Sequence, residues 1–261
     1  MDSKKVVTKS RKKKKKHTGE AVLVVSALIL GVLIVMLVYR HREESTIVGG
    51  QTAERTINGA FPLPSEIIES DRLTYFATMD IPDMIWERMN GKSYNETCPV
   101  DRSELRYVTV LYWGRDSEAH RGELVVNEQI ADDVADIFFE LYKASYPIEG
   151  VRLIDDYGGN DEVSMANNNT SCFNSRNATG SSTTLSRHAY GMAIDINPLY
   201  NPYIGQDGTV LPVTAGDYAD RTRHFVMKID ENDYAYKLFT EHGFTWGGNF
   251  ETVKDYQHFE K

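Results

Sequence analysis

An uncharged apolar segment near the N-terminus constrains this chain more than any other feature. From Ala21 to Tyr39 the sequence runs for 19 residues without a charged side chain. A helix of that length measures about 28 Å, which is close to the hydrocarbon thickness of a bilayer. We therefore predict one transmembrane helix at residues 21–39 that is retained as a signal anchor. A cleaved signal peptide is the alternative, but its apolar core is usually ~7–15 residues long and ends at a small-x-small site, which this segment lacks.

The charges on either side of this segment predict its orientation. Residues 1–20 carry nine Lys and Arg against two acidic residues, a balance of +7, whereas only Arg40 and Arg42 follow the segment before Glu43. Because basic flanks remain on the cytoplasmic side, residues 1–20 are predicted to be a cytoplasmic tail. The C-terminal bulk is then expected outside the cytoplasm, in a single-pass protein of the cell membrane.

The part after this segment divides into a spacer and a folded domain. Residues 40–70 mix Gly, Thr, Pro and acidic residues without sustained periodicity, as is typical of a linker. Residues 71–261 are predicted to form one extracytoplasmic domain. The overall content of 41 % hydrophobic and 26 % charged residues is that of a globular protein.

Net charge and cysteine content restrict the partners and the metal sites. The chain carries −9 overall, so the part after the +7 tail carries −16, whereas phosphate binding needs a basic face. A nucleic-acid partner is therefore not expected. Cys98 and Cys172 are the two cysteines and cannot form a four-cysteine zinc site, so a metal must be held mainly by His and carboxylates. Outside the membrane this pair either forms a disulfide or stays free.

The alternation of apolar residues predicts strands and a fold class. β-branched and aromatic residues predict strands at 107–113 and 151–154. Residues 158–187 are polar and rich in Asn, Ser, Thr and Gly, which predicts a long functional or mobile loop. With long-range pairing of the strands, we predict an α+β domain that has an antiparallel sheet and flanking helices.

Two segments have the pattern of amphipathic helices. Apolar residues recur at helical spacing in residues 127–146, where Asn127 can cap the helix and Pro147 stops it. A second helix is predicted at about residues 231–242, with Gly243 as its C-terminal cap.

Two other segments carry residues that suit a metal site. Residues 193–196 alternate as a strand does, so Asp195 points to the face opposite its apolar neighbours. His188 precedes this strand, and His258 lies three residues before Lys261. Two imidazoles and one carboxylate, with a water in the fourth position, form an open zinc site of the catalytic kind. Zinc in such a site lowers the pKa of its water toward ~7 and so provides a nucleophile at neutral pH.

Each of these residues alone is weak evidence for a metal. A single histidine is more often a surface or core residue than a ligand, and Asp195 alone could cap a turn or form an ion pair. The H-x6-D spacing is equally unspecific. The prediction of a metal site depends on finding both segments in one chain.

Together, the two segments resemble a known family, the bacterial zinc peptidases of cell-wall peptides. The family comprises D-alanyl-D-alanine carboxypeptidases and dipeptidases, the VanY-like enzymes, and the L-alanyl-D-glutamate endopeptidases of phage lysins. Its S-x-H-x-x-G-x-A-x-D motif is matched by Ser186, His188, Gly191, Ala193 and Asp195. Its C-terminal pattern is matched by His258, Phe259 and Glu260, and the W-G-G of the endopeptidase branch by residues 246–248. The resemblance covers about residues 105–261.

The resemblance implies a fold, a ligand set and a base. The fold is the α+β fold that these enzymes share with the hedgehog signalling domain, and the zinc ligands are His188, Asp195 and His258. The general base of the family lies three residues before the last ligand, at Asp255 here. Carboxypeptidases and dipeptidases usually have Glu at this place, whereas the endopeptidase branch has Asp. The resemblance therefore favours an endopeptidase and leaves a carboxypeptidase open.

Two further residues are candidates for substrate binding. Arg176 lies upstream of the motif, where the family carries an Arg that contacts the substrate and the oxyanion, and a guanidinium suits both. The alternative for Arg176 is a solvent-exposed loop residue. Ser186 either hydrogen-bonds the substrate or shapes the turn before His188.

The sequence thus predicts a membrane-anchored zinc metallopeptidase that hydrolyses peptidoglycan stem peptides, with Asp255 as general base. The alternative is a binding module on the same scaffold, which recognises a wall peptide or a protein without cutting it. Asp255 favours the enzyme, because a non-catalytic site has no need of a base beside the metal. No Gly-rich phosphate loop opens a helix, so a nucleotide cofactor is not expected.

Overall fold

A computed structural model describes residues 63–64 and 67–261. The chain divides into two units, Met1–Phe61 and Pro62–Lys261, and the described residues belong to the second. The predicted cytoplasmic tail, the transmembrane segment and most of the linker lie outside the described residues. Among the helices that the structure describes, none is both long enough and apolar enough to cross a membrane.

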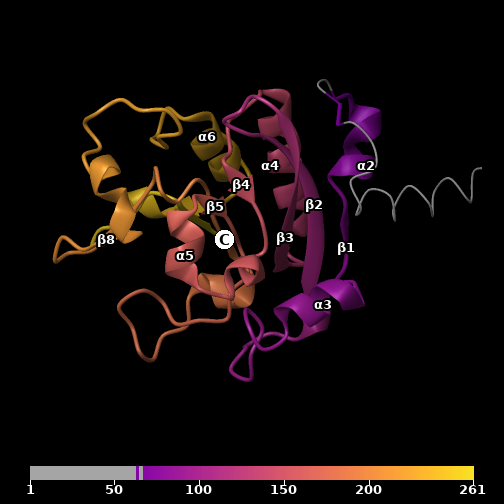
Figure 1. The fold of residues 1–261 in the computed structure, drawn as a ribbon, viewed down its shortest axis with the longest axis horizontal. Coiled ribbons are helices and arrows are strands. Elements are labelled where there is room, and N and C mark those ends of the chain that lie inside the picture. The colour runs from indigo at the N-terminus through magenta and orange to yellow at the C-terminus, as the bar shows by residue number, and fades with distance from the viewer. Residues whose placement is uncertain (1–62, 65–66) are drawn as a thin grey trace, which may run out of the picture. The chain divides into compact units, whose positions relative to one another are not determined.

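A three-stranded antiparallel sheet supports the rest of this unit. Its order is β1 (Thr78–Asp80), β2 (Leu105–Trp113) and β3 (Ala119–Asn127). Strands β2 and β3 pair along all nine residues of each strand. Helix α4 (Ala131–Lys143) packs along this sheet (Figure 1).

The two faces of this sheet pack against different apolar clusters. Val108 and Val110 lie in the main core, whereas Leu105 and Tyr107 lie in a second, smaller cluster, as the two-residue period of a strand requires. Helix α4 covers the main core with one apolar face. The side chains on that face include Val134, Ile137, Phe138 and Leu141.

Short elements surround the sheet. Before β2 lie the helices α2 (Arg72–Tyr75) and α3 (Asp83–Met89), and after α4 follow β4 (Gly150–Val151), α5 (Asp161–Ala166) and β5 (Asn169–Thr170). Strands β4 and β5 pair in parallel. The 3-10 helices are η1 (Glu69–Asp71), η2 (Arg102–Glu104), η3 (Ile154–Tyr157), η4 (Arg187–Tyr190), η5 (Val213–Tyr218) and η6 (Gly247–Asn249).

The C-terminal part has two small antiparallel sheets. One has the order β6 (Ala193–Asp195), β11 (His258–Glu260), β9 (Thr245–Trp246), and the other β10 (Lys254–Asp255), β7 (Tyr203–Ile204), β8 (Val210–Leu211). Helix α6 (Tyr234–Glu241) contacts β9 and α4, and the C-terminus lies near the centre of the view in Figure 1. This architecture confirms the predicted α+β class with antiparallel sheets, apart from the parallel β4–β5 pair.

The first predicted helix is confirmed but is shorter than predicted at both ends. Strand β3 extends to Asn127, so this residue does not cap the helix; its Oδ1 atom accepts the N–H of Gln129 in the turn that follows. Helix α4 ends at Lys143, and Ser145 has a φ of 53°, which takes the chain out of the helix before Pro147. Strand β3 was not predicted, although its run of Leu and Val was a signal.

The second predicted helix is also confirmed. Helix α6 begins after Asp233, whose side chain accepts the N–H groups of Ala235 and Tyr236. Gly243 follows its end with a φ of +82°, as its predicted capping role requires. The predicted strand at 107–113 is confirmed as β2.

Two predictions between these helices are wrong. The strand expected at 151–154 ends at Val151, and Ile154 begins η3. The loop expected at 158–187 contains α5 and β5, and its residues Asn168 and Asn169 are buried. Polar side chains can be buried here because they form hydrogen bonds with backbone N–H and C=O groups that have no backbone partner. Asn169, for example, accepts the N–H of Arg152 and donates to the carbonyl of the same residue.

The two cysteines are both free. Cys172 is buried in the main core, where its Sγ atom lies 3.6 Å from the carbonyl of Gly191. Cys98 is half-buried and packs against the second cluster. Of the two alternatives for this pair, the structure therefore shows the unpaired one.

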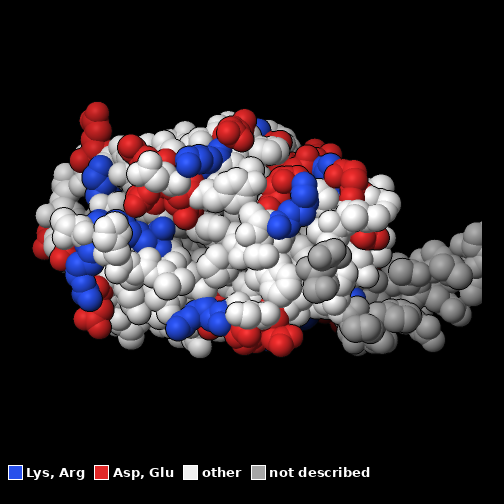
Figure 2. Space-filling view, turned by 90° about the horizontal axis from the view of Figure 1, so that it is seen from above, with Lys and Arg blue, Asp and Glu red and all other residues white. Residues whose placement is uncertain are grey.

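Charges of both signs share the surface of this unit. On the face shown in Figure 2, acidic side chains gather in patches, with single basic side chains between them and an uncharged area in the middle.

Candidate active site

The short sheet β6–β11 brings two of the predicted ligands opposite each other. In its antiparallel register Asp195 of β6 pairs with His258 of β11. Ile194 and Phe259, on the same strands, point the other way into the main core. The alternation predicted for residues 193–196 is thus confirmed, and it turns Asp195 away from the core.

A tight turn returns His188 to the same place. His188 lies in η4, which ends at Gly191 with a φ of +67°. A Cβ atom on Gly191 would lie 2.7 Å from the backbone nitrogen of Asn127, so only glycine fits between this turn and the end of β3.

His188, Asp195 and His258 form one compact, buried cluster. The Nε2 atom of His188 lies 3.2 Å from Asp195 Oδ2, and the Nδ1 atom of His258 lies 3.1 Å from Asp195 Oδ1. The two ring nitrogens are 3.2 Å apart. The side chains are 3 %, 4 % and 8 % exposed for His188, Asp195 and His258. The three residues predicted as ligands therefore lie together.

Hydrogen bonds on the outer side of each ring set which nitrogen faces the cluster. The Nδ1 atom of His188 lies 2.6 Å from the carbonyl of Cys172, to which it can only donate. The Nε2 atom of His258 lies 3.1 Å from Glu260 Oε2 and donates to that carboxylate. The inward atoms are then the lone pairs of His188 Nε2 and His258 Nδ1.

This arrangement fits a metal cation. Two ring nitrogens and a carboxylate converge here, so they repel one another unless a positive charge lies between them, either a metal cation or a proton on His258 Nδ1. Burial by itself lowers the pKa of His258, but its hydrogen bonds to Asp195 and Glu260 outweigh burial and raise that pKa to about 10. Burial likewise opposes the ionisation of Asp195, yet the neighbouring histidines hold its pKa well below the usual value. The cluster favours a cation, and two nitrogens with one oxygen are ligands that suit zinc.

Asp255 reaches the same site from the other small sheet. It lies in β10, opposite Tyr203 of β7, and its buried Oδ1 atom has no hydrogen-bond partner among the described residues. Burial raises the pKa of Asp255 to about 6, with a further increase from the charge of Asp195 and a partial offset from His258. A carboxylate that has one unpaired oxygen and a raised pKa has the properties of a general base.

Gly247, in the W-G-G segment at residues 246–248, allows β10 with Asp255 to lie close to β11 with His258. A Cβ atom on Gly247 would lie 2.5 Å from the carbonyl oxygen of Asp255 and 3.1 Å from His258 Cβ. A larger residue at Gly247 would therefore push apart the strands that carry the candidate base and the last candidate ligand.

A pocket of about 360 Å³ opens over the cluster. His188, His258, Asp255 and Glu260 line it together with Arg176 and Ser186, so the pocket brings all predicted site residues except Asp195 to one surface. Asp195 lies beneath it as the partner of both histidines. Its remaining walls include Arg187, Tyr203, Phe250 and Val253.

Arg176 is held in place and does not extend into solvent. Its Nη2 atom lies 2.8 Å from Asp161 Oδ2, its Nη1 donates to the carbonyl of Asn177, and its side chain is 23 % exposed. Its buried Nε atom has no hydrogen-bond partner among the described residues. Of the two alternatives for Arg176, the structure favours the pocket residue.

Ser186 shapes the turn before His188. Its Oγ atom accepts the N–H of His188 at 3.2 Å, which makes it the N-terminal cap of η4. It also lines the pocket, so a contact with substrate is compatible with this bond.

The sequence did not reveal how Cys172, Asp161 and Glu260 take part. The carbonyl of Cys172 contacts His188, which is 16 positions away in the chain, and the carboxylate of Asp161 contacts Arg176, which is 15 positions away. No local sequence pattern indicates contacts over such separations. The position of Glu260 could have been predicted, because residues i and i+2 of a strand lie on the same face, which places this carboxylate beside His258.

A family model described as D-alanyl-D-alanine carboxypeptidase matches residues 179–261. This match confirms the resemblance for the segment that carries the three candidate ligands and Asp255. Arg176 lies just before the matched residues. No curated protein and no solved structure matches the chain.

Proposed function

We propose that this chain is a membrane-anchored zinc metallopeptidase that hydrolyses peptidoglycan stem peptides outside the cytoplasm. The observation that carries the proposal is the buried cluster of His188, Asp195 and His258 with the unpartnered Asp255 in one pocket. The match of this segment to a carboxypeptidase family supports the reaction class.

His188 Nε2, His258 Nδ1 and Asp195 would hold the zinc ion. When bound, zinc would supply the positive charge that polarises a water molecule and the scissile carbonyl. The chain itself orients the ligands, because Cys172 and Glu260 fix the two imidazole rings from outside.

Asp255 is positioned to move the proton. As a carboxylate it takes a proton from the attacking water and then delivers it to the nitrogen of the leaving amine. With a pKa of about 6 it is ionised at neutral pH and yet is a stronger base than an ordinary Asp.

Arg176 is suited to the negative charges of the substrate. A carboxypeptidase substrate carries its terminal carboxylate one residue from the cut, and a D-glutamate residue also carries a carboxylate. The guanidinium of Arg176, which lines the pocket, can donate to such a group or to the oxyanion that develops at the carbonyl. The presence of Asp rather than Glu at position 255 favours the L-alanyl-D-glutamate bond over the D-alanyl-D-alanine bond.

Incubation of the full-length chain with defined muropeptides, followed by mass spectrometry of the products, tests this proposal. An endopeptidase separates L-alanine from D-glutamate, whereas a carboxypeptidase releases one D-alanine. Whichever of the two activities is observed should disappear when a chelator removes the metal and return when zinc is added. If no muropeptide is cut while wall fragments still bind, the chain is a binding module on this scaffold.

The membrane anchor is tested separately. Protease added to intact spheroplasts should digest the part after Glu43 and spare the N-terminal tail. Recovery of a mature chain that lacks residues 1–40 would instead show a cleaved signal peptide.

A further inference from the structure

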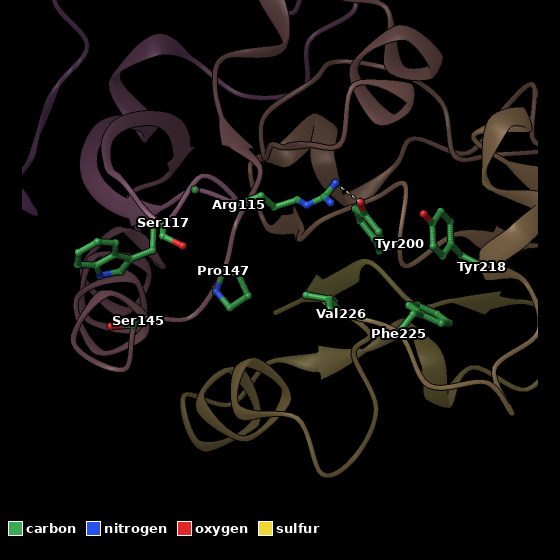
Figure 3. Close-up of a pocket in the computed structure, with 10 residues that line it drawn as sticks. Arg115, Ser117, Ser145, Pro147, Tyr200, Tyr218, Phe225 and Val226 are labelled. Carbon is green, nitrogen blue, oxygen red and sulfur yellow. Dashed lines mark hydrogen bonds between the residues drawn. The ribbon is translucent and has the colours of Figure 1, made fainter.

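A second pocket, which shares no residue with the candidate active site, opens on the same domain (Figure 3). Its volume is about 680 Å³, within the roughly 300–1,000 Å³ of ligand pockets. We call it the aromatic pocket and define it by Trp113, Arg115, Tyr200, Tyr218, Phe225 and Val226. No step of the proposed hydrolysis uses these residues.

One wall of the aromatic pocket is a row of rings. The ring centroids of Tyr200 and Tyr218 are 4.6 Å apart, and those of Tyr218 and Phe225 are 5.1 Å apart. Val226, beside them, is 68 % exposed. Figure 3 shows these side chains together on one side of the pocket. The ring planes are inclined by 53° and 61° to one another, so the half-buried rings of Tyr218 and Phe225 each offer their own apolar surface for stacking by a ring-shaped ligand.

Polar groups surround this wall. The Nη1 atom of Arg115 donates to the hydroxyl of Tyr200 at 2.6 Å, and the Arg115 side chain is 55 % exposed. Glu149 lies 3.6 Å from the same guanidinium and offsets its charge. Ser117 and Ser145 add hydroxyl groups at the other side of the pocket, away from Tyr218 and Phe225 (Figure 3).

This combination suits a pyranose sugar better than an ion or an aliphatic chain. A pyranose has an apolar face of C–H groups, which stacks on aromatic rings, and an edge of hydroxyl groups, which exchanges hydrogen bonds with Arg115, Ser117 and Ser145. A simple anion would find its only cation, Arg115, already close to Glu149. An aliphatic chain would leave the polar edge of the pocket without partners.

The aromatic pocket is close to the candidate active site along the chain. Tyr200 lines the aromatic pocket, and Tyr203 lines the active-site pocket and pairs with Asp255. Three residues of chain span at most about 11 Å, so the two pockets have walls within that distance. An extended substrate peptide of about three residues covers the same span.

Arg221 connects the two pockets through a network of contacts. Its guanidinium donates to the carbonyls of Tyr200 and Ile229 at 2.7 and 2.9 Å. It also lies over the rings of Phe225 at 5.2 Å and Tyr256 at 4.3 Å, and Tyr256 directly follows Asp255. The wall of the aromatic pocket and the strand of the candidate base are therefore held by one side chain.

We propose that the aromatic pocket binds a pyranose sugar of the glycan strand to which the stem peptide is attached. The inference rests on the proposed function, because it places the sugar and the peptide of one substrate in two neighbouring pockets. The protein then distinguishes a peptide on its glycan from a free peptide.

Binding of a peptide-free sugar to the full-length chain tests the pocket without any hydrolysis. The probe is the disaccharide of N-acetylglucosamine and N-acetylmuramic acid, observed by saturation-transfer NMR and titration calorimetry. Binding is expected to wild type, and Tyr218→Ala and Phe225→Ala should each weaken it by about tenfold. Tyr234→Ala, an exposed tyrosine of α6 outside both pockets, is the matched control and should bind as wild type does.

Kinetics provide the second readout. The kcat/KM for a disaccharide-linked peptide should exceed that for the same free peptide by about tenfold in wild type, and the ratio should fall toward one in Phe225→Ala. The Tyr234→Ala control should keep the wild-type ratio.

The outcomes separate this inference from the proposed function. If both peptides are cut equally well and the disaccharide does not bind wild type, the sugar site is refuted and the peptidase stands. If neither peptide is cut but the disaccharide binds and both pocket variants lose it, the sugar site stands and the peptidase is refuted. Binding that neither pocket variant weakens places the sugar elsewhere and overturns the inference.

Discussion

Strands β2 and β3 are nine residues long and bury apolar side chains on both faces, whereas the strands that carry Asp195, Asp255 and His258 are two or three residues long. In the long strands nine backbone pairs and the pattern of buried side chains together fix the register. In the short strands few backbone pairs exist, and hydrogen bonds made by the histidine side chains add to them. His188 bonds to the backbone carbonyl of Cys172, and His258 bonds to the carboxylate of Glu260.

The long sheet accounts for most of the stability of this unit, whereas the short strands carry the candidate active site. The sheet with α4 contains most of the large apolar side chains, which stabilise by burial. The C-terminal part buries charged and polar groups at its candidate site, an arrangement that costs stability and is typical of functional sites. Substitutions in the first region should therefore change unfolding, and substitutions in the second should change metal binding and turnover.

The largest effect is expected for His258→Ala. Removal of one of three protein ligands takes away most of the affinity of the site, so tight zinc binding should be lost while the fold remains. Zinc content after dialysis measures this loss, and circular dichroism checks the fold. His242→Ala is the matched control, because His242 also pairs with a carboxylate, Asp133, but outside the site. Full zinc occupancy in His258→Ala would remove this residue from the ligand set.

The next effect is expected for Asp255→Asn. The change keeps size and polarity but removes the base, so hydrolysis of muropeptides should fall by roughly 10²–10⁴-fold with little change in KM. Zinc content and thermal stability should stay as in wild type. Asp230→Asn, at an exposed ion pair with Lys228, is the control and should cut normally. An Asp255→Asn variant that cuts as fast as wild type would show that the base lies elsewhere.

Phe138→Ala tests whether the stability of the long sheet is separable from zinc binding at the candidate site. Phe138 of α4 is fully buried in the main core, and its loss should reduce the free energy of unfolding by about 3–5 kcal/mol. Denaturant unfolding measures the loss. Leu73→Ala, at a side chain 83 % exposed, should change it by less than about 0.5 kcal/mol. Folded Phe138→Ala should still bind zinc; if it loses zinc affinity as strongly as stability, the two regions are not separable.

The smallest effect is expected for Glu260→Ala. Loss of the carboxylate that holds the outer nitrogen of His258 should weaken zinc affinity by about 10–100-fold. Glu260→Gln should lose less, because its amide oxygen still accepts the Nε2–H. Competition with a chromophoric chelator measures both affinities, and nitrogen NMR reports the His258 tautomer. Glu140→Ala, at an exposed carboxylate of α4, is the control. An unchanged affinity and tautomer in Glu260→Ala would limit Glu260 to packing.

Much of the fold could be predicted where one side-chain pattern runs over many residues. Strand β2 and helices α4 and α6 have such patterns, and the structure contains all three. Strand β3 depends on pairing with β2, and the packed segment around Asn168 and Asn169 depends on amide hydrogen bonds. Amide side chains in a sequence are typical of loops, so the burial of this segment could not be predicted.

The sequence alone was enough to predict the three candidate ligands, because strand alternation and the motif that carries the family resemblance are local properties of residues 186–195 and 255–260. Tertiary structure decided which ring nitrogens face inward, why Arg176 is held beside the pocket, and that an aromatic pocket exists at all. These features join segments far apart in the chain, such as Cys172 with His188 and Arg115 with Tyr200. The periods of strands and helices span only two to four residues and can be read from a local sequence. The hydrogen bonds and ring contacts of the two pockets join distant segments, so they depend on how the whole domain packs.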